Sequence, residues 1–237
     1  MKIRLVYSKL GKVRFTSHRD MARVWERCLR KADIAMAYSE GFSPRPKLSF
    51  GLALPTGGES LAEYLDITLA HEWEPSDISE LPRRLTASMP TGIDVLEAVA
   101  LPLGVDSLQQ AVTSCTWTIE MVGTTIERRS AQIAAVLDAP TLRVTRERKG
   151  KPVEDDLRPL ILVLDPTEMP DGALGVLAEL GTKPRAVRPS ELLTALDPSL
   201  PTGRIRRLNQ WITVDGARRE PLAVGAAVDE RTEVGAR

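Results

Sequence analysis

The order of strand-like and helix-like segments in the first hundred residues constrains the fold more than any other feature of this sequence. Apolar residues alternate in some segments, as in a strand, and recur every three or four residues in others, as in a helix. In chain order we expect a strand at 2–15 with a turn or bulge at Gly11, a helix from Ser17, strands at 47–54 and 63–69, a helix from Pro75 and a strand at 92–101. This order predicts a ferredoxin-like sandwich, an antiparallel sheet with its helices on one face.

The second half repeats this plan more loosely. We expect a strand at 114–122, a helix at 125–137, strands at 142–148 and 160–164, a strand or helix at 172–181, a helix at 188–196 and a strand at 210–214. The sequence therefore predicts an α+β fold of two ferredoxin-like βαββαβ units in tandem, a pseudo-duplication, at 1–104 and 105–215. The tail, 216–237, lacks periodicity and is expected to be disordered.

Composition is that of an ordinary globular protein, with 43% hydrophobic and 27% charged residues in a chain of 237. No run of about 18 apolar residues could span a membrane, and the basic N-terminal segment lacks the apolar stretch of a secretory signal. The two cysteines, Cys28 and Cys115, suit a reducing compartment and give no disulfide framework. We therefore expect a cytoplasmic protein with no membrane partner.

The formal net charge of zero conceals an uneven distribution of charge along the chain. Residues 1–50 carry twelve Lys and Arg against four Asp and Glu, whereas residues 51–140 carry four against thirteen. A basic block followed by an acidic one indicates an anionic partner or internal charge complementarity, and the sequence leaves both open.

The first predicted helix begins with a hydroxyl, an imidazole and a carboxylate within four residues. Neighbouring residues in a first turn point in different directions, so Ser17, His18 and Asp20 do not form a catalytic triad. Ser17 is instead expected to cap the helix, with Asp20 as the acid of a capping box. His18 remains a candidate contact, because the first turn of a helix presents unpaired N–H groups to an anion.

The outer face of the same helix carries a row of arginines, which a single acid, Glu26, interrupts. Such a row can follow a phosphate backbone, and it can equally be the solvated face of an amphipathic helix. Aromatic residues near the basic block could stack on bases, although core packing explains Phe15 equally well. The candidate residues for binding nucleic acid or a partner are His18, Arg19, Arg23, Arg27, Tyr38, Phe42, Ser43, Arg45 and Lys47.

The sequence GFSPRPK, which follows this helix, places one arginine between two prolines. Pro44 and Pro46 each favour an extended conformation in the residue before them, so Arg45 presents its guanidinium at reduced entropic cost. We interpret this segment as a shaped loop rather than a flexible linker. Arg45 is expected to contact an anionic ligand, or else to pin the loop by pairing with an acid such as Glu59 or Glu63.

A second basic patch lies near the middle of the chain. Its candidate binding residues are Arg146, Arg148, Lys149 and Lys151. Three acids follow immediately, Glu154, Asp155 and Asp156, and would partly neutralise the patch. The alternative is a long exposed hairpin without a binding role.

Motifs for cofactor chemistry are missing from the sequence. There is no phosphate-binding loop, no dinucleotide fingerprint and no metal-ligand spacing among the two histidines and two cysteines. No closely spaced cysteine triplet could hold an iron–sulfur cluster. We therefore assign no catalytic residues, no metal ligands and no cofactor to this chain.

The segment GFSPRPKLSFGLALPTGGES, after the helix RFTSHRDMARVWERCLRKADI, closely resembles the radical-SAM-associated (radical-SAM-linked) proteins of unknown function. The match extends to about Asp197, through RERKGK and RPSELL. Members occur fused to a radical S-adenosylmethionine protein or encoded beside one. The resemblance therefore implies such a partner, which carries the iron–sulfur cluster and the S-adenosylmethionine.

Basic residues and family resemblance together predict a non-catalytic accessory subunit. It would position a substrate, RNA in our interpretation, for a radical S-adenosylmethionine enzyme that modifies or processes tRNA or rRNA. One alternative is a protein-interaction module that binds no nucleic acid. A stand-alone enzyme of unknown activity is the other.

Overall fold

The computed structural model describes residues 1–148 and 150–226, and the chain divides into two compact units. The first unit is Met1–Val112 together with the chain from Gln210 onward, and the second is Thr113–Asn209. Strand β10, Thr202–Val214, therefore begins in the second unit and ends in the first. The observed division lies after the predicted boundary at residue 104, and the chain returns to the first unit before residue 215.

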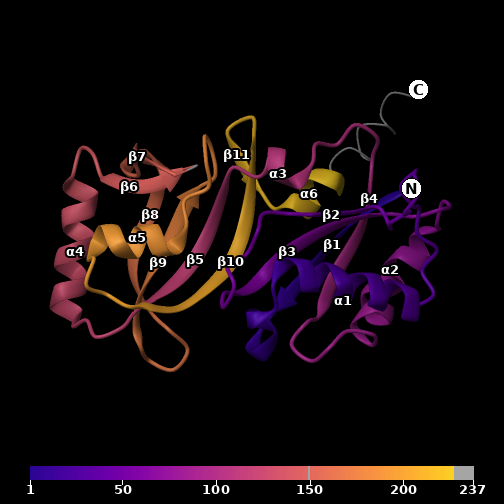
Figure 1. Cartoon of the computed structure of the whole chain (residues 1–237), viewed down its shortest axis with the longest axis horizontal. Coiled ribbons are helices and arrows are strands. Elements are labelled where there is room, and N and C mark those ends of the chain that lie inside the picture. Colours follow the sequence, from indigo (N-terminus) through magenta and orange to yellow (C-terminus); the bar gives the residue numbers. More distant parts are fainter. Residues whose placement is uncertain (149, 227–237) are drawn as a thin grey trace. The chain divides into compact units, whose positions relative to one another are not determined.

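Residues 2–101 of the first unit have the predicted element order. Its strands are β1 Lys2–Lys9, β2 Leu48–Phe50, β3 Glu59–Thr68, β4 Val95–Leu101 and β11 Ala217–Arg219 (Figure 1). Its helices are α1 His18–Lys31, α2 Pro75–Thr86, α3 Leu108–Ala111 and α6 Pro221–Ala226, with a 3-10 turn at Gly11–Phe15. Of these elements, α3, β11 and α6 were not predicted. β1 pairs antiparallel with β3 and β4, and β2 pairs antiparallel with β3. The resulting strand order is β4-β1-β3-β2, and β3 also pairs with β10.

Gly11 ends the first strand earlier than predicted. Its φ of 68° lies in the left-handed region that favours glycine, and its N–H donates to Glu59 Oε1 at 2.9 Å. The turn predicted at this position is therefore present, but the residues after it form a 3-10 turn rather than a continuing strand.

Helix α1 begins as predicted. The Ser17 hydroxyl accepts a hydrogen bond from the Asp20 N–H at 3.2 Å, which satisfies one of the unpaired donors of the first turn. One side of the helix, with Met21, Trp25 and Leu29, is buried. This amphipathic pattern leaves the arginine row on the outer face, where the sequence places it.

Both faces of the first unit's sheet are covered. On one face, Ile3, Leu5 and Tyr7 pack against the core of α1 and α2, and the Tyr7 and Trp25 rings meet edge to face at 5.0 Å. On the other face, residues from α3 and α6 join a second apolar cluster of Val6, Ala62, Tyr64, Leu108 and Leu222. The predicted arrangement, with helices on one face, holds for α1 and α2 alone. The second face needs its own cover because its side chains are apolar too.

A charged pair lies inside the same sheet. Arg4 donates from Nε and Nη2 to the two oxygens of Asp66 at 2.7 and 2.9 Å, and both side chains are 0% exposed. Lys2 Nζ lies 3.2 Å from the same carboxylate. Arg4 Nη1 also donates to the Pro221 carbonyl at 3.2 Å, which ties α6 to the sheet.

These contacts correct the expectation of a disordered tail from residue 216. Ala217–Arg219 pairs antiparallel with β10, and Leu222 is buried in the second apolar cluster. The rest of the predicted tail, 227–237, lies outside the described residues.

The second unit contains the same kinds of element with a hairpin added. Its strands are β5 Ser114–Met121, β6 Arg143–Arg148, β7 Lys151–Asp156, β8 Ile161–Glu168 and β9 Leu174–Gly181. Its helices are α4 Ile126–Asp138 and α5 Pro189–Leu196, with a 3-10 turn at Arg158–Leu160. β9 pairs antiparallel with β5 and β8 in the order β10-β5-β9-β8, and β6 and β7 form a separate antiparallel pair. The described chain is thus α+β, with mostly antiparallel pairing and six α-helices.

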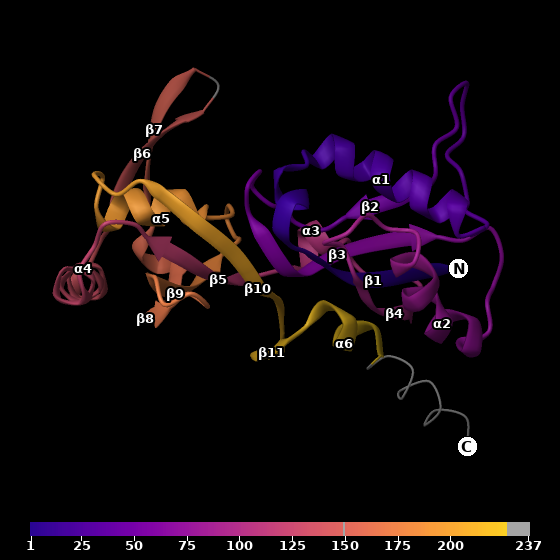
Figure 2. The same cartoon turned by 90° about the horizontal axis from the view of Figure 1, so that it is seen from below.

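Two sequence expectations changed in this unit. Residues 172–181, which fitted a strand or a helix, form the strand β9. The expected sheet strand at 142–148 is instead the first half of the β6–β7 hairpin, and β7 was not predicted. In each unit a hairpin-like segment follows the first helix and projects from its own unit: residues 38–46 after α1, and β6–β7 after α4 (Figure 2).

Candidate functional site

A groove of 540 Å³ lies between α1 and the chain that follows it. The buried side chains of Leu29, Ile34 and Met36 contribute its apolar part. Its polar and aromatic lining comes from Arg19, Arg23, Glu26, Arg30, Asp33, Tyr38 and Arg45, with Ala22, Ala35, Pro44 and Pro46 between them. The groove therefore brings together Arg19, Arg23, Tyr38 and Arg45, four of the nine candidate residues.

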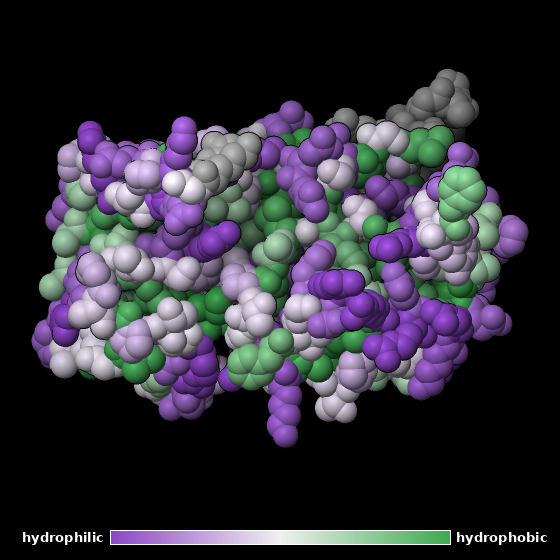
Figure 3. All heavy atoms as spheres, viewed as in Figure 1, coloured by the Kyte–Doolittle hydropathy of each residue, from purple (hydrophilic) through white to green (hydrophobic). Residues whose placement is uncertain are grey.

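The lining residues of α1 form one stripe along the helix. Arg19, Arg23 and Arg30 are spaced by four and seven residues, so they lie on one face, and the stripe is about 16 Å long at 1.5 Å per residue. Arg27 lies eight residues after Arg19, which turns it about 80° away at 100° per residue. Its Nε donates to the Arg23 carbonyl at 3.4 Å, and its side chain does not line the groove. Figure 3 shows hydrophilic side chains gathered over α1.

The other wall is residues 38–46, which we call the arm. Tyr38 and Pro46 form an antiparallel bridge, and the Ser39 N–H donates to the Arg45 carbonyl at 2.9 Å. The Arg45 N–H donates in return to Ser39 Oγ at 3.0 Å. The backbone on both sides of the Arg45 side chain is therefore fixed, in agreement with the interpretation of a shaped loop.

Arg45 does not pin the loop through an acid. No ion pair of its guanidinium occurs within residues 1–148 and 150–226, and the side chain is exposed. Glu59, one of the two expected partners, accepts from the Gly11 N–H at 2.9 Å and from Arg14 at 3.4 Å. Arg45 is thus presented on the wall of the groove.

Charges within the groove are mixed, with cations in excess. Four guanidiniums line it against the two carboxylates of Glu26 and Asp33. Arg23 also pairs with Asp20 at 3.1 Å, but both side chains are more than half exposed, so the pair is weak. The Ser17 hydroxyl, and then Arg23, hold the pKa of Asp20 below its usual value.

Asp33 follows the end of α1 by two residues, and both its backbone conformation and its charge are unfavourable there. Its φ is 53°, a conformation that glycine adopts without cost, and its carboxylate lies at the negative end of the helix dipole. We expect Asp33→Gly to raise the free energy of unfolding by about 1 kcal/mol, because it relieves both effects. Urea denaturation measures this change, with Asp33→Asn as the control that removes the charge and keeps a side chain. A destabilised Asp33→Gly variant would contradict the expectation.

His18 lies outside the groove. Its ring meets Phe50 edge to face at 5.0 Å, in a small pocket that Lys9 and Glu63 also line. Lys9 is buried and donates to the Thr16 carbonyl at 2.9 Å, and this burial lowers the pKa of its amine. His18 is therefore positioned by packing at the start of α1 rather than aligned with the arginines.

Three other candidates lie on or beside the arm but not in the groove. Phe42 is fully exposed, with a relative accessibility of 110%, and Ser43 next to it is exposed as well. Lys47 is exposed beyond the arm, where its N–H donates to the Ala37 carbonyl at 2.9 Å. The arm thus has a side that lines the groove and a tip that faces away from it.

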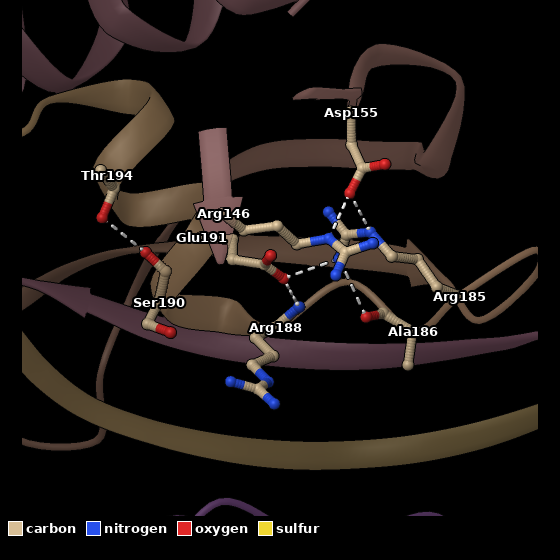
Figure 4. A network of polar contacts seen from close by, with 8 residues as sticks. All are labelled: Arg146, Asp155, Arg185, Ala186, Arg188, Ser190, Glu191 and Thr194. Atoms are coloured by element: carbon tan, nitrogen blue, oxygen red, sulfur yellow. Dashed lines mark hydrogen bonds and ion pairs between the residues drawn. The ribbon is translucent and has the colours of Figure 1, made fainter. Parts of the chain in front are cut away.

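One residue of the second basic patch, Arg146, is engaged within its own unit. Arg146 pairs with Asp155, which also accepts from Arg185 at 2.7 Å (Figure 4). Arg185 reaches Glu191 at 3.0 Å in turn, and the network holds the base of the β6–β7 hairpin to α5. The hydrogen bond from Arg146 is the main reason that the pKa of Asp155 is lowered.

Two other patch residues, Arg148 and Lys151, lie at the end of that hairpin where β6 leads into β7. Arg148 pairs in register with Lys151, whose side chain is exposed, and Lys149 lies outside the described residues. β6 and β7 thus form a hairpin, and a binding role of the patch stays a prediction.

The list of candidate residues omitted three charged residues that line the groove: Glu26, Arg30 and Asp33. Arg30 belongs to the arginine row that the sequence placed on the outer face of this helix, and it lies eleven residues from Arg19, close to three full turns. No sequence signal marks Asp33 as part of a site, since its position depends on the turn that ends α1.

No metal site or membrane span is found in the part of the chain that the structure describes. Its His, Cys, Asp and Glu side chains do not gather in groups of three or more that could hold an ion. None of its helices is long and apolar enough to cross a membrane.

Comparison with known proteins identifies one family. The model of a family described as "Uncharacterized protein conserved in bacteria (DUF2344)" matches residues 2–189. No curated protein matches. Among solved structures, a chain of the "Crystal Structure of a Cbf5-Nop10-Gar1 Complex" is similar, with a TM-score of 0.47 and 9% sequence identity. The similarity covers 87% of this chain and 48% of that one, so the present chain spans about half its length.

Proposed function

Because this chain belongs to the family of uncharacterized bacterial proteins DUF2344, whose description names no activity, we propose a function for it from the groove. The chain is a non-catalytic accessory subunit that binds RNA and positions it for a radical S-adenosylmethionine enzyme. The reaction served would be the modification or processing of tRNA or rRNA.

The gathering of four guanidiniums in one groove is the observation that carries this proposal. Arg19, Arg23, Arg30 and Arg45 repel one another, and an anionic ligand would relieve that repulsion. Arginine suits phosphate in particular, because its planar fork can donate two parallel hydrogen bonds. Tyr38, 54% exposed on the same wall, offers a face on which a base can stack.

The radical enzyme enters the proposal through the resemblance of the GFSPRPKLSFGLALPTGGES segment and of the helix before it. These residues build the groove, since α1 and the arm are its two walls. We therefore assign the iron–sulfur cluster and the S-adenosylmethionine to the partner, and substrate positioning to this chain.

RNA binding and its dependence on salt test the first part of the proposal. If three or four phosphates are contacted, affinity for tRNA or rRNA fragments should fall about 20- to 50-fold between 50 and 200 mM salt, at a slope of about −0.7 per contact. Filter binding at the two salt concentrations measures this change. Absent binding, or binding that does not respond to salt, would remove the RNA proposal.

Co-purification tests the second part. A radical S-adenosylmethionine protein encoded beside this chain should elute with it, and deletion of this chain should remove a modification or processing step from tRNA or rRNA. An unchanged modification profile in the deletion strain would contradict the accessory role.

The tip of the arm favours a second candidate function, a protein-interaction module. Phe42 is fully exposed there, and the adjacent charged residue is the acid Glu40, which suits a protein pocket better than a phosphate backbone. In that case Phe42→Ala should abolish co-purification with the radical enzyme, and the wild-type chain should bind no RNA.

We also infer that the two units are copies of one ferredoxin-like plan. Without the β6–β7 hairpin, the second unit reads β5-α4-β8-β9-α5-β10, and its strand order β10-β5-β9-β8 corresponds to β4-β1-β3-β2 in the first. In this correspondence the β6–β7 hairpin takes the place of the arm, and its Arg146 is engaged with Asp155.

A further inference from the structure

We propose that the groove holds a single strand of RNA of about five nucleotides, excludes duplexes, and recognises the ribose through Glu26 and Asp33. This proposal rests on the RNA-binding function above and names the form of RNA that the groove accepts.

The shape of the cationic stripe indicates an extended ligand. Arg19, Arg23 and Arg30 are spread over about 16 Å of α1, too far apart to converge on one phosphate. A stacked strand rises about 3.4 Å per nucleotide, so the stripe matches about five stacked nucleotides and fewer extended ones. A mononucleotide would meet at most part of this row.

The lining of the groove indicates a single strand rather than a duplex. The cations line a hollow of 540 Å³ rather than a flat or convex surface. The face of Tyr38, 54% exposed on the wall of the groove, can stack only on a base whose own face is free. In a duplex those faces are stacked, and an RNA duplex is recognised instead through its backbone.

The two carboxylates require a hydrogen-bond donor on the ligand. Glu26 and Asp33 repel phosphate, so their presence in a groove for a polyanion is favourable only where the ligand offers an O–H or N–H group. Exocyclic amino groups occur on some bases, whereas every ribonucleotide carries a 2′-hydroxyl. Carboxylates along the strand would thus favour RNA over DNA.

Fluorescence anisotropy with labelled oligonucleotides tests these three points. The probes are oligouridine of 2, 4, 6 and 8 nucleotides, oligodeoxyuridine of 8, an 8-base-pair RNA duplex and folded tRNA. Uracil has no exocyclic amino group, so a difference between the uridine and deoxyuridine probes reports on the 2′-hydroxyl.

With wild-type protein, affinity should rise with length up to about five nucleotides and then level off. The duplex should bind at least tenfold more weakly than the 8-nucleotide strand, and the deoxyuridine strand roughly 2- to 10-fold more weakly. Tyr38→Ala should weaken binding of the single strand at least about fivefold, and Tyr38→Phe should not.

Asp33→Gly separates ribose recognition from folding, because we expect this variant to be more stable than the wild type. It should bring the affinities for the uridine and deoxyuridine strands closer together. Arg27→Ala is the matched control on the same helix, and it should leave all affinities within about twofold.

The outcomes distinguish this inference from the proposed function. If folded tRNA binds in a salt-dependent manner but oligouridine does not bind at any length, the single-strand inference is overturned and RNA binding stands. Equal affinity for the duplex and for the single strand would also overturn the single-strand inference and leave RNA binding standing. Equal affinity of the wild type for uridine and deoxyuridine strands overturns ribose recognition. If no RNA binds, both proposals fall.

Discussion

Replacing Asp66 by alanine is expected to lower the free energy of unfolding by about 3–5 kcal/mol. The substitution leaves the Arg4 guanidinium without the two hydrogen bonds of 2.7 and 2.9 Å that it makes to the carboxylate. Because Arg4 is 0% exposed, water cannot replace them. A buried charge with no partner is among the largest single penalties in a folded protein. Urea denaturation followed by circular dichroism measures the change.

A double variant shows whether the unpaired charge is the cause. Arg4→Met with Asp66→Leu removes both charges and fills the space with apolar groups, so it should recover most of the lost stability. Recovery is expected to be incomplete, since Arg4 Nη1 also donates to the Pro221 carbonyl and holds α6 on the sheet. A loss below about 1 kcal/mol in Asp66→Ala would mean that the pair contributes no more than an exposed one.

Periodicity predicted the parts of the fold that bury one regular face. The apolar face of strand β1 is visible in the sequence because Ile3, Leu5 and Tyr7 occupy alternate positions. That of helix α1 is visible because Met21, Trp25 and Leu29 recur every four residues. The order of elements over residues 2–101 follows from such segments alone.

Segments without a regular apolar face were missed. Strand β7, KPVEDD, is charged and contains Pro152, and its partner β6 supplies its backbone hydrogen bonds. The first half of β10 has the sequence TGRIRRLN, whose three arginines interrupt the apolar alternation expected of a strand. Ile205 and Arg207 are nevertheless both buried. Helix α6 is held by the Arg4 hydrogen bond and one buried leucine. Contacts far along the chain decide these elements, so local pattern does not reveal them.

One wall of the candidate site, the arginine row of α1, could be predicted from local pattern, whereas the position of the other wall, the arm, could not. The arginine row follows from helical spacing, and a stricter use of that spacing would have excluded Arg27 and included Arg30. That the arm lies against α1 does not follow from any local pattern. It depends on the left-handed turn at Asp33 and on backbone bonds such as Ala37 N–H to the Thr68 carbonyl, 2.8 Å, which tie the base of the arm to β3.

Arg45→Ala should weaken RNA binding by about 1–3 kcal/mol, roughly 5- to 150-fold, and leave stability within about 0.5 kcal/mol. Stability is spared because the Ser39–Arg45 hydrogen bonds use the backbone of Arg45 and the Ser39 hydroxyl, not the guanidinium. Binding suffers because the fixed backbone presents that guanidinium at the groove, where its ordering costs little. Thermal melts and anisotropy titrations on the same preparation measure both quantities.

Two matched variants sharpen this prediction. Arg27→Ala removes an equal charge from the outer side of α1 and should change binding little, which separates a contact in the groove from a general loss of positive charge. Arg45→Lys keeps the charge but loses the planar fork, so it should fall between wild type and Arg45→Ala. If Arg45→Ala and Arg27→Ala weaken binding equally, long-range attraction explains the result and the groove is not the contact site. If Arg45→Ala instead melts early and its folded fraction binds normally, Arg45 supports the arm rather than the ligand.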